Sequence, residues 1–585
     1  MKSLFKLRKY FARYKTTIYL GFLFIFLSNI TSVYVPLFIR DGIDELRRQI
    51  SSPALIKYAL LIVGVTFISG VFRFLIRQTI IVTSRKIEFD LRNDFWSHLQ
   101  KLSFKYFQNT KTGDIMAHAT NDINAVRNFI GPAVMYSFDT FTLFVFTLAL
   151  MFSIDVELSL LSLLPFPVLS IFVYYFGKKI HLLFTRIQEH FSVLTAKAQE
   201  NLNGIRIIKA YVREQSEINH FRNLSYEYFK KNLDKIKVDS LFHPILFLTI
   251  GSSIIIIMWF GGMKVINNQL TLGELTAFIL YMGYLIWPAI AFGWITNLTQ
   301  QAAASQKRLN AIFAIEPEIK DSHLTNYNIK SLNGEIEFRN VSFKYREKLP
   351  FVLKDINLKI PAGATYAIIG HTGCGKTTLV NLILRFYDVV EGEILIDGHN
   401  IKTIPLKVLR NEISFVPQET FLFSDTLKNN IAYGLNGSSE IEVNQRIEEA
   451  VKIAHLTPDI ESFPQGIETI IGERGITLSG GQKQRTSIAR AIAKGGKILI
   501  LDDCLSAVDT STEEIILTNL KNFMKGRTSL IISHRISTIK DADQIIVLDN
   551  GVIAEQGTHE ELVALDGIYA RIYQKQLLEK ELEEI

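Results

Sequence analysis

The chain has 585 residues, of which 48% are hydrophobic and 21% are charged, and its formal net charge is +7. This length exceeds what one compact core holds, so two or more domains are expected. Only two cysteines are present, which excludes a disulfide-stabilised secreted scaffold and indicates a reducing compartment for the soluble part.

The N-terminal residues 1–15, MKSLFKLRKYFARYK, are basic and aromatic and run into a long apolar stretch. A cleaved signal peptide has a short apolar core followed by a small-residue cleavage site, and neither is evident. We therefore expect residues 1–15 to form an interfacial amphipathic helix at the cytoplasmic side of a membrane.

Residues 16–314 contain the apolar runs expected of a transmembrane domain. A bilayer core of about 30 Å needs about 20 mainly apolar helical residues to cross it. Six helices are predicted, at residues 17–39, 55–80, 133–153, 156–176, 242–266 and 274–298. Pro165, Pro167 and Pro288 lie within these segments and predict kinks or bends.

The connections between these helices differ in charge, which predicts their orientation. The long polar segments at about 81–132 and 177–241 are helix-rich, whereas Ile154-Asp155 and 267–273 carry no Lys or Arg. The second long segment is rich in Lys and Arg, and an excess of these residues marks cytoplasmic loops. Both chain ends are then cytoplasmic, and the positive charge indicates a lipid bilayer rather than nucleic acid as partner.

Asp139 is the most conspicuous acid within the predicted spans. It is either a contact for substrate or an ion in a central cavity, or a position where helices pack near the span's outer half.

After Leu309 the apolar runs end. Residues 315–333 are expected to form a linker, and residues 334–573 alternate strand and helix patterns, which indicates a mainly parallel α/β sheet with crossover helices. Residues 574–585 read as a charged C-terminal helix. The predicted fold is thus a six-helix membrane domain fused to an α/β P-loop domain.

A phosphate-binding loop is predicted where the strand pattern ATYAIIG precedes GHTGCGKTT and a helical run. Glycines let backbone N–H groups face phosphate oxygens, and the following helix N-terminus adds partial positive charge. Lys376 would reach the terminal phosphates and the Thr377 hydroxyl would bind Mg²⁺. The expected nucleotide-binding residues here are Gly370, His371, Thr372, Gly373, Cys374, Gly375, Lys376, Thr377 and Thr378.

Two further motifs complete a nucleotide site. The buried-strand pattern ILILDD places Asp502 where it can hold Mg²⁺ through water, with Asp503 beside it. In LSGGQ, Ser479, Gly480, Gly481 and Gln482 open a helix and offer a second phosphate-binding N-terminus. Two such cradles in one chain suggest that two copies enclose ATP between them.

The ordered set of P-loop, LSGGQ, ILILDD, SAVD and SHR resembles an ATP-binding cassette (ABC) half-transporter of the bacterial exporter type. The resemblance covers nearly the whole chain. Residues 112–123 and 200–211 resemble the two cytoplasmic coupling regions of such exporters, which relay closure of the nucleotide domains to the membrane helices.

The resemblance implies further roles for single residues. Tyr345 would stack on adenine, Gln418 would sense Mg²⁺ and the attacking water, and His534 would be the switch histidine near the γ-phosphate. Asp509 would contact the opposite site, and GERG at 472–475 would contact the other domain.

The sequence departs from the family pattern at Asp503, where the family has the glutamate that aligns or deprotonates the attacking water. Aspartate withdraws the carboxylate by about 1 Å, and misplacement of that order costs up to about 10²-fold in rate. In heterodimeric exporters of this family, the subunit with such a slow site keeps an intact LSGGQ, as this chain does. The histidine at the position of His534 is often replaced in such subunits, whereas this chain has it. A heterodimer is favoured over a homodimer.

The expected function is ATP-driven export of hydrophobic or amphipathic compounds (drugs, lipids or lipopeptides) across the bacterial cytoplasmic membrane. The partners are a second half-transporter and the bilayer, and the cofactors are ATP and Mg²⁺. An ATP-gated channel or sensor with slow hydrolysis, and a dedicated lipid or peptide exporter, are the alternatives.

Overall fold

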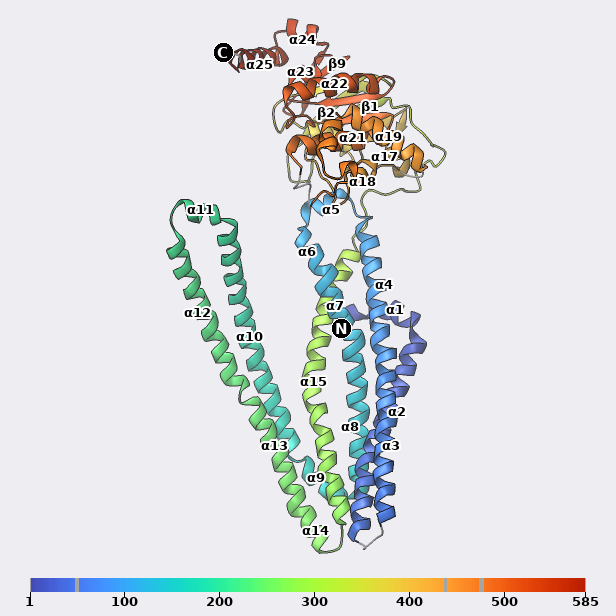
Figure 1. Cartoon of the computed structure of the whole chain (residues 1–585), viewed down its shortest axis with the longest axis vertical. Helices are drawn as coiled ribbons and strands as arrows, with labels where there is room; N and C mark the ends of the chain where they lie inside the picture. Colours follow the sequence, from blue (N-terminus) through green and yellow to red (C-terminus); the bar gives the residue numbers. More distant parts are fainter. Residues whose placement is uncertain (1, 48–51, 436–438, 473–477, 584–585) are drawn as a thin grey trace. The chain divides into compact units, whose positions relative to one another are not determined.

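The computed structural model describes residues 2–47, 52–435, 439–472 and 478–583, which fall into two compact units (Figure 1). Unit 1 comprises Met1–His98 and Gly113–Ala314, and unit 2 comprises Leu99–Thr112 and Ile315–Ile585.

Unit 1 is helical. It begins with a 3₁₀ turn, η1 (Lys2–Leu7), and a short helix, α1 (Arg8–Arg13), in the segment predicted to be an interfacial helix. The helices that follow are α2 (Lys15–Arg47), α3 (Ser52–Ile76), α4 (Val82–Leu99), α6 (Thr112–Ala117), α7 (Ile123–Asn128), α8 (Val134–Ile154), α9 (Val156–Leu163), α10 (Pro165–Asn203), α11 (Ile205–Ala210), α12 (Glu214–Asp239), α13 (Phe242–Ile256), α14 (Gly262–Ile266) and α15 (Leu272–Phe313). Single π-helical turns interrupt this series at η2 (Arg77–Ile81), η3 (His118–Asp122), η4 (Phe129–Ala133) and η5 (Ile257–Gly261).

Five helical stretches among the described residues are long and apolar enough to span a membrane: Lys15–Arg47, Leu55–Leu99, Thr112–Ile154, Phe247–Ile266 and Leu272–Phe313. They correspond to five of the six predicted spans. The remaining predicted span, 156–176, is built from α9 and the start of α10, with a shorter apolar helix at Val156–Val168. Pro165 stands at the first position of α10, where its ring suits a helix start rather than a kink.

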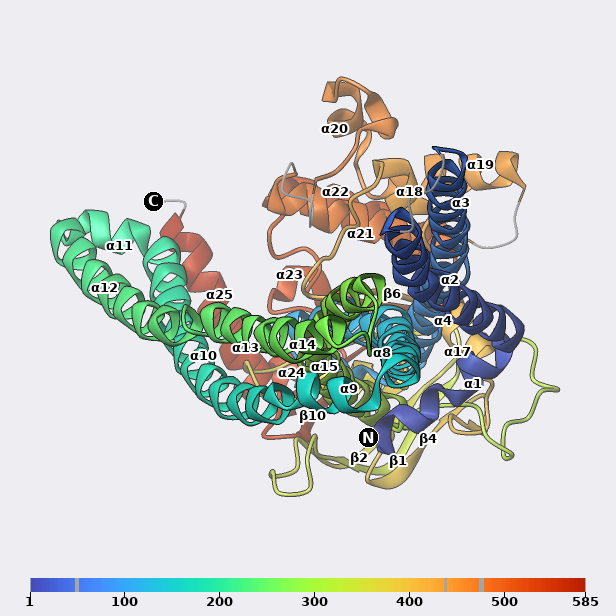
Figure 2. The ribbon, with the colours of Figure 1, turned by 90° about the horizontal axis from the view of Figure 1, so that it is seen from below.

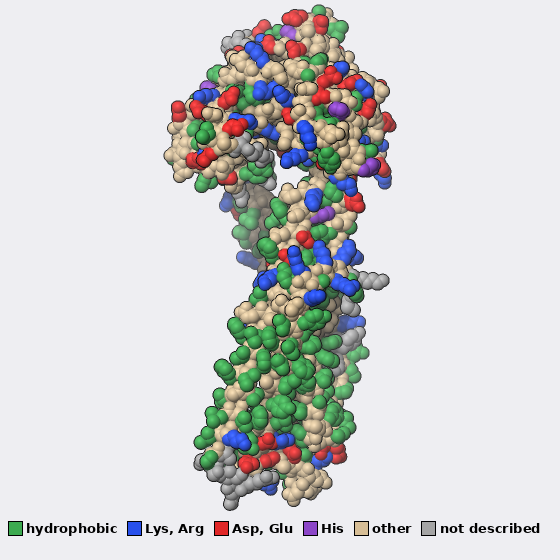
Figure 3. All heavy atoms as spheres, turned by 90° about the vertical axis from the view of Figure 1, so that its right-hand side faces the viewer, with side chains coloured by type: hydrophobic (Ala, Val, Ile, Leu, Met, Phe, Trp, Pro, Cys, Tyr) green, Lys and Arg blue, Asp and Glu red, His purple; other side chains and the backbone are tan. Residues whose placement is uncertain are grey.

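The surface of the spans is apolar. On the face shown in Figure 3, hydrophobic side chains form a continuous band, with many lysines and arginines at its upper end and both basic and acidic side chains at its lower end. Along α3 the outward-facing side chains are Leu55, Ile56, Leu60, Leu61, Val63, Phe67, Ile68, Val71 and Phe74. Such a surface matches lipid tails rather than water.

Asp139 lies in α8 beside polar residues of α2. The Asn29 side-chain amide donates to the main-chain oxygen of Asp139 at 2.9 Å and to the Thr142 hydroxyl at 2.6 Å. These bonds tie α2 to α8, and both interpretations of Asp139 stay open.

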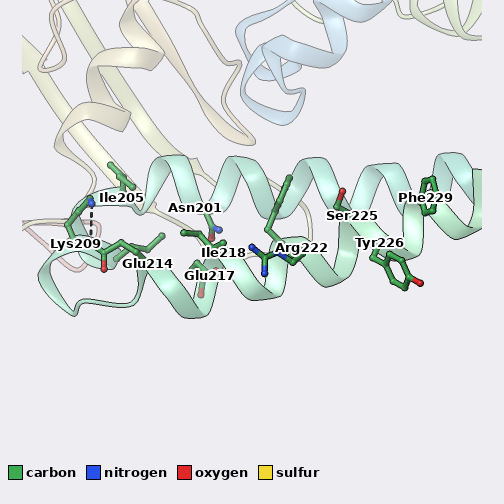
Figure 4. Close-up of a pocket in the computed structure, with 12 residues that line it drawn as sticks. Asn201, Ile205, Lys209, Glu214, Glu217, Ile218, Arg222, Ser225, Tyr226 and Phe229 are labelled. Atoms are coloured by element: carbon green, nitrogen blue, oxygen red, sulfur yellow. Dashed lines mark hydrogen bonds and ion pairs between the residues drawn. The ribbon is translucent and has the colours of Figure 1, made fainter.

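The segment 177–241, predicted to be a cytoplasmic extension, forms a hairpin of α10 and α12 joined by α11. The two long helices pack on each other, and within the described residues their distal part lies beside no other helix of unit 1 in either view (Figures 1 and 2). A groove of about 820 Å³ runs between them, and Lys209 and Glu214 form an ion pair of 3.0 Å at its end (Figure 4).

Unit 2 contains two sheets. A six-stranded sheet has the order β10-β9-β3-β8-β7-β6, and all neighbours are parallel except β10 and β9. Its strands are β3 (Thr365–Ile369), β6 (Ile413–Val416), β7 (Ile498–Asp502), β8 (Thr528–Ile532), β9 (Gln544–Asp549) and β10 (Val552–Gly557). The predicted parallel α/β sheet is therefore confirmed.

The second sheet is antiparallel, in the order β2-β1-β4-β5, and was not predicted. Its strands are β1 (Ile336–Phe343), β2 (Leu353–Ile360), β4 (Glu391–Ile396) and β5 (His399–Asn400). The burial of β2 alternates along much of its length, so one face packs on the core and the other meets solvent.

Both faces of the parallel sheet are buried, because successive residues of its strands enter two different cores. Ala367 and Ile369 of β3 lie in one core, and Ile368 lies in the other. This explains the uninterrupted aliphatic run ILIL of β7, which alternation between water and core would not permit.

The helices of unit 2 are α16 (Lys376–Ile383), α17 (Leu406–Glu412), α18 (Leu427–Ala432), α19 (Glu440–Ile453), α20 (Thr457–Ser462), α21 (Gly480–Lys494), α22 (Thr510–Met524), α23 (Ile536–Ile539), α24 (His559–Ala564) and α25 (Ile568–Glu583).

Helix α5 (Phe104–Asn109) belongs to unit 2 by its contacts. The Phe104 ring packs on Phe386 with centroids 5.3 Å apart, and the Tyr387 hydroxyl donates to Gln108. The predicted coupling region at 112–123 follows directly and forms α6, η3 and the first residue of α7; its role stays a prediction.

Candidate nucleotide-binding site

The candidate site lies where adjacent parallel strands end. Strands β3, β8, β7 and β6 are neighbours in that order, so their carboxyl ends share one edge. The loops that leave this edge carry residues 370–378, His534, the Asp502–Asp503 pair and Gln418. Crevices outside the carboxyl ends of parallel strands are where such folds bind ligands.

The P-loop needs glycine at Gly370 and Gly375. Both have positive φ, 156° and 109°. A Cβ at Gly370 would lie 2.1 Å from the Leu548 carbonyl oxygen, and one at Gly375 would lie 2.8 Å from Leu353. The loop therefore keeps its backbone close to the sheet and opens directly into α16, as a phosphate cradle requires.

The Lys376 side chain is buried and curls back over this loop. Its ammonium donates to the carbonyl oxygens of Gly370 at 2.8 Å and His371 at 3.0 Å. The Cys374 thiol lies 3.9 Å from the same ammonium and is free and buried. A single positive charge thus lies at the centre of the loop.

Asp502 and Thr377 form a pair suited to a divalent cation. Asp502 is 1% exposed, and its Oδ2 accepts no hydrogen bond from the described residues. Burial raises the pKa of Asp502, while the Thr377 hydroxyl and the Lys376 charge act against that shift. A carboxylate oxygen without a hydrogen-bond partner, beside a hydroxyl, belongs to the oxygen donors that Mg²⁺ prefers.

Asp503 and His534 lie at the same edge. Asp503 has φ of 44°, and its N–H donates to the Ile532 oxygen at 2.8 Å, which joins the ends of β7 and β8. Packing around the imidazole lowers the pKa of His534, the Lys376 charge lowers it further, and the Asp503 charge opposes both. The ring, with an ordinary pKa of 6.5, is therefore mostly neutral at pH 7.

Tyr345 reaches the same loop from the antiparallel sheet. Its hydroxyl lies 2.9 Å from the Thr378 hydroxyl, and its ring packs edge-on against Phe343 and Tyr387. Gln418 follows β6 and is exposed. The P-loop, Asp502, Asp503, His534 and Tyr345 are thus brought together in one chain, with Gln418 at the adjoining strand end.

The LSGGQ motif, predicted to be a second anion site, forms the start of α21. Ser479 caps α21 by accepting from the Gln482 N–H at 3.2 Å, and Gln482 accepts from the Ser479 N–H at 2.9 Å. Among the described residues, no hydrogen bond or ion pair joins residues 479–482 to residues 370–378.

Two side chains that support these loops were not singled out from the sequence. Gln484 of α21 is buried and accepts from the Ala507 N–H at 2.9 Å while donating to the Ser506 hydroxyl at 3.1 Å. Arg490 donates to the oxygens of Phe421 and Asn430 at 2.9 and 2.8 Å. Both side chains could have been found from the sequence, because each is a polar residue on the core-facing side of an amphipathic helix.

Asp509 caps α22 by accepting from the Thr512 N–H at 2.9 Å. The Ser511 hydroxyl and this N–H hold the pKa of Asp509 well below its usual range. The predicted contact of GERG with another domain lies largely on residues 473–477, outside the described residues.

Comparisons with known proteins agree with this geometry. The family model described as ABC transporter transmembrane region matches residues 18–289, and the one described as ABC transporter matches residues 353–506. A probable multidrug resistance ABC transporter ATP-binding/permease protein of Bacillus subtilis is 37% identical over 98% of this chain and 96% of its own length. An ATP-dependent lipid A-core flippase of Syntrophus aciditrophicus is 38% identical over 86% of this chain and 82% of its own.

A solved structure of a bacterial Atm1-family ABC exporter with ATP bound has a TM-score of 0.78 and 27% identity, and the match covers 96% of this chain and 99% of that one. Members of this exporter family work as dimers. The chain therefore belongs to the ABC transporter family, as a multi-pass exporter subunit of the cytoplasmic membrane whose cytoplasmic ATPase domain is coupled to transport.

Proposed function

We propose that this chain is half of an ATP-driven exporter of hydrophobic or amphipathic compounds, of the drug or lipid class. The observation that carries the proposal is that one edge of the parallel sheet gathers Lys376, Thr377, Asp502 and His534 in a chain that also contains apolar spans. The names of the relatives, multidrug resistance transporter and lipid A-core flippase, support this substrate class.

Mg²⁺ is the expected partner of ATP. Thr377 and the unpartnered Oδ2 of Asp502 would hold it. The ion supplies charge neutralisation on the phosphates. The Lys376 ammonium, now on two carbonyl oxygens, would transfer to phosphate oxygens, which are stronger acceptors.

A second copy or a related subunit would complete each site. We expect the residue 479–482 cradle to contact nucleotide held by the P-loop of the other chain, because members of this exporter family work as dimers. The α10–α12 hairpin also needs a partner, since α11 and its flanks expose Ile207, Tyr211 and Val212 at 65%, 75% and 82%. Exposed apolar clusters of this kind mark protein interfaces.

Within the pair, phosphate contacts from both chains would favour closure, and hydrolysis would remove them. Segments 112–123 and 200–211 would relay this change to the spans. We place Asp503 as the residue that orients the attacking water, and its short side chain makes this the slower of two unequal sites. That assignment favours a heterodimer, and the retained His534 is the feature that weighs against it.

The export function is tested with the purified complex in liposomes that contain a fluorescent hydrophobic dye. ATP should drive dye movement in the wild type, and Lys376→Ala should abolish it, because the loop then lacks its positive charge. Lys483→Ala, on the half-exposed surface of α21, is the control. ATP-dependent ion conductance in a planar bilayer without dye movement would instead favour a gated channel.

A further inference from the structure

The last helix of the chain is anchored firmly at its start. At the beginning of α25, the Glu555 carboxylate of β10 accepts from the N–H groups of Ile568 and Tyr569, the latter at 3.0 Å. Tyr569 is fully buried, and its hydroxyl lies 2.7 Å from His559 Nδ1. The direction of α25 is therefore set by the folded core of unit 2.

Two turns further along, α25 reaches the loop that carries the switch histidine. The Gln576 Nε2 donates to the main-chain oxygen of His534 at 2.6 Å. Its Oε1 accepts from the Ile536 N–H at 2.9 Å. One primary amide thus holds the main chain on both sides of Arg535, using a donor and an acceptor together.

The same loop is held from the other side by α22. Glu513 is 3% exposed and accepts from the Thr538 hydroxyl at 2.6 Å and from the Arg535 guanidinium. Ser533 accepts from the Arg535 N–H at 3.0 Å. The backbone of His534 therefore lies between two helices, one of which begins at Asp509.

We propose that Gln576 is a positioning residue for His534. Through Gln576, the C-terminal helix α25 fixes the orientation of the His534 imidazole. The bond to the His534 carbonyl oxygen fixes the orientation of the peptide plane that follows this residue, and hence the direction of its side chain. This rests on the proposed role of His534 at the γ-phosphate. It gives a catalytic connection to the helix that the sequence left without a function.

The test is single-turnover ATP hydrolysis by the purified full-length chain, together with its partner subunit if it has one, because this measures even a slow chemical step. Gln576→Met keeps the length and removes both hydrogen bonds, so the hydrolysis rate should fall about tenfold. The affinity for ATP should stay unchanged. Gln576→Glu keeps only the acceptor and should be equally slow. Gln574→Met, exposed on the same helix, should behave as wild type.

A double-substitution cycle separates positioning from a general structural effect. In a His534→Ala background, Gln576→Met should cause no further loss of rate. An additive loss of rate in the double variant, or an unchanged rate in Gln576→Met, would each overturn the inference. If His534→Ala hydrolyses ATP normally, or the wild type not at all, the proposed role of His534 fails, and the inference fails with it.

Discussion

Asp502 is the last residue of β7 and Asp503 follows it directly, but the two carboxylates have different surroundings. Asp502 is buried against Thr377 and Lys376, whereas Asp503 is half-buried and turns out of the strand at a φ of 44°. Aspartate and asparagine tolerate this left-handed region better than longer residues do. The backbone at 503 therefore suits the residue present, even though the carboxylate is short for its proposed task.

Asp503→Glu tests whether length limits this site. The added methylene moves the carboxylate about 1 Å further out, and we expect single-turnover hydrolysis at this chain's P-loop to rise about tenfold or more. Asp503→Asn is the matched control and should lower the residual rate. Slower turnover in Asp503→Glu would show that the site is built for aspartate.

Asp122 illustrates a buried charge outside the nucleotide site. It is 5% exposed in η3 and receives hydrogen bonds from Arg308, at 3.0 Å from Nε, and from Ser305 at 2.8 Å. Burial alone would raise the pKa of Asp122, but the bonds from Arg308, His118 and Ser305 hold it below the usual value. The carboxylate thus fastens the α6–α7 segment to α15.

We expect Asp122→Asn to destabilise the protein by about 1–3 kcal/mol, because Arg308 loses its charged partner. The folded-state pKa is depressed, so the stabilisation is present above the ordinary value of 3.8 and is lost as pH falls below it. Unfolding midpoints in detergent at pH 7.5 measure the effect. Asp234→Asn, which breaks an exposed pair with Lys237, should change the midpoint little.

At the scale of elements, helix α21 connects the two nucleotide contacts of the domain. Its N-terminus carries the LSGGQ motif, and Gln484 one turn later binds the 506–507 backbone and hydroxyl that precede Asp509. A displacement of α21 would therefore be passed to the loop after β7.

Gln484→Met should break this connection. The Ala507 N–H then loses its partner, at a cost of about 1–3 kcal/mol. We expect steady-state ATP turnover of the complex to fall several-fold, while ATP binding at the P-loop, followed by a fluorescent analogue, is retained. Lys483→Met on the same turn is the control. Equal turnover in both variants would contradict the role of Gln484 in connecting α21 to the loop after β7.

Motifs within one short stretch were predictable, because the P-loop, LSGGQ and ILILDD each carry their whole geometry in consecutive residues. The side-chain contacts that hold these motifs in place could not be predicted, because the partners are distant in the sequence. Gln576 contacts His534 across 42 residues, and Gln484 contacts Ala507 across 23. The antiparallel sheet was missed for a similar reason: β1 pairs not only with its neighbour β2 but also with β4, although β2 and β3 lie between them in the chain. Only the fold brings such partners together.

At the scale of the whole molecule, the α10–α12 hairpin presents an exposed apolar surface in a segment predicted to lie outside the membrane. Its groove is lined by Ile205, Ile218, Phe221 and Phe229, among others (Figure 4). Five of the six predicted spans correspond to long apolar helical stretches among the described residues, and the sixth corresponds to α9 and the first residues of α10. Hydropathy locates an apolar span but does not show where a helix is interrupted.

Replacing the exposed pair Ile207 and Tyr211 by serine tests whether this tip engages a partner. We expect substrate-stimulated ATP turnover to fall about tenfold or more, since truncation of central apolar anchors costs 2 kcal/mol or more. ATP affinity should stay unchanged. Ile441→Ser, 73% exposed on α19, is the matched control. Wild-type stimulation in the double variant would place the partner contact elsewhere.

The two cysteines have a practical consequence. Cys374 and Cys504 are unpaired and only 7% and 3% exposed. Thiol-reactive dyes or spin labels should therefore leave the native protein largely unmodified. A single cysteine introduced at position 212, 82% exposed beside α11, would be labelled selectively, so motion of the hairpin during an ATP cycle could be followed without removing either native thiol.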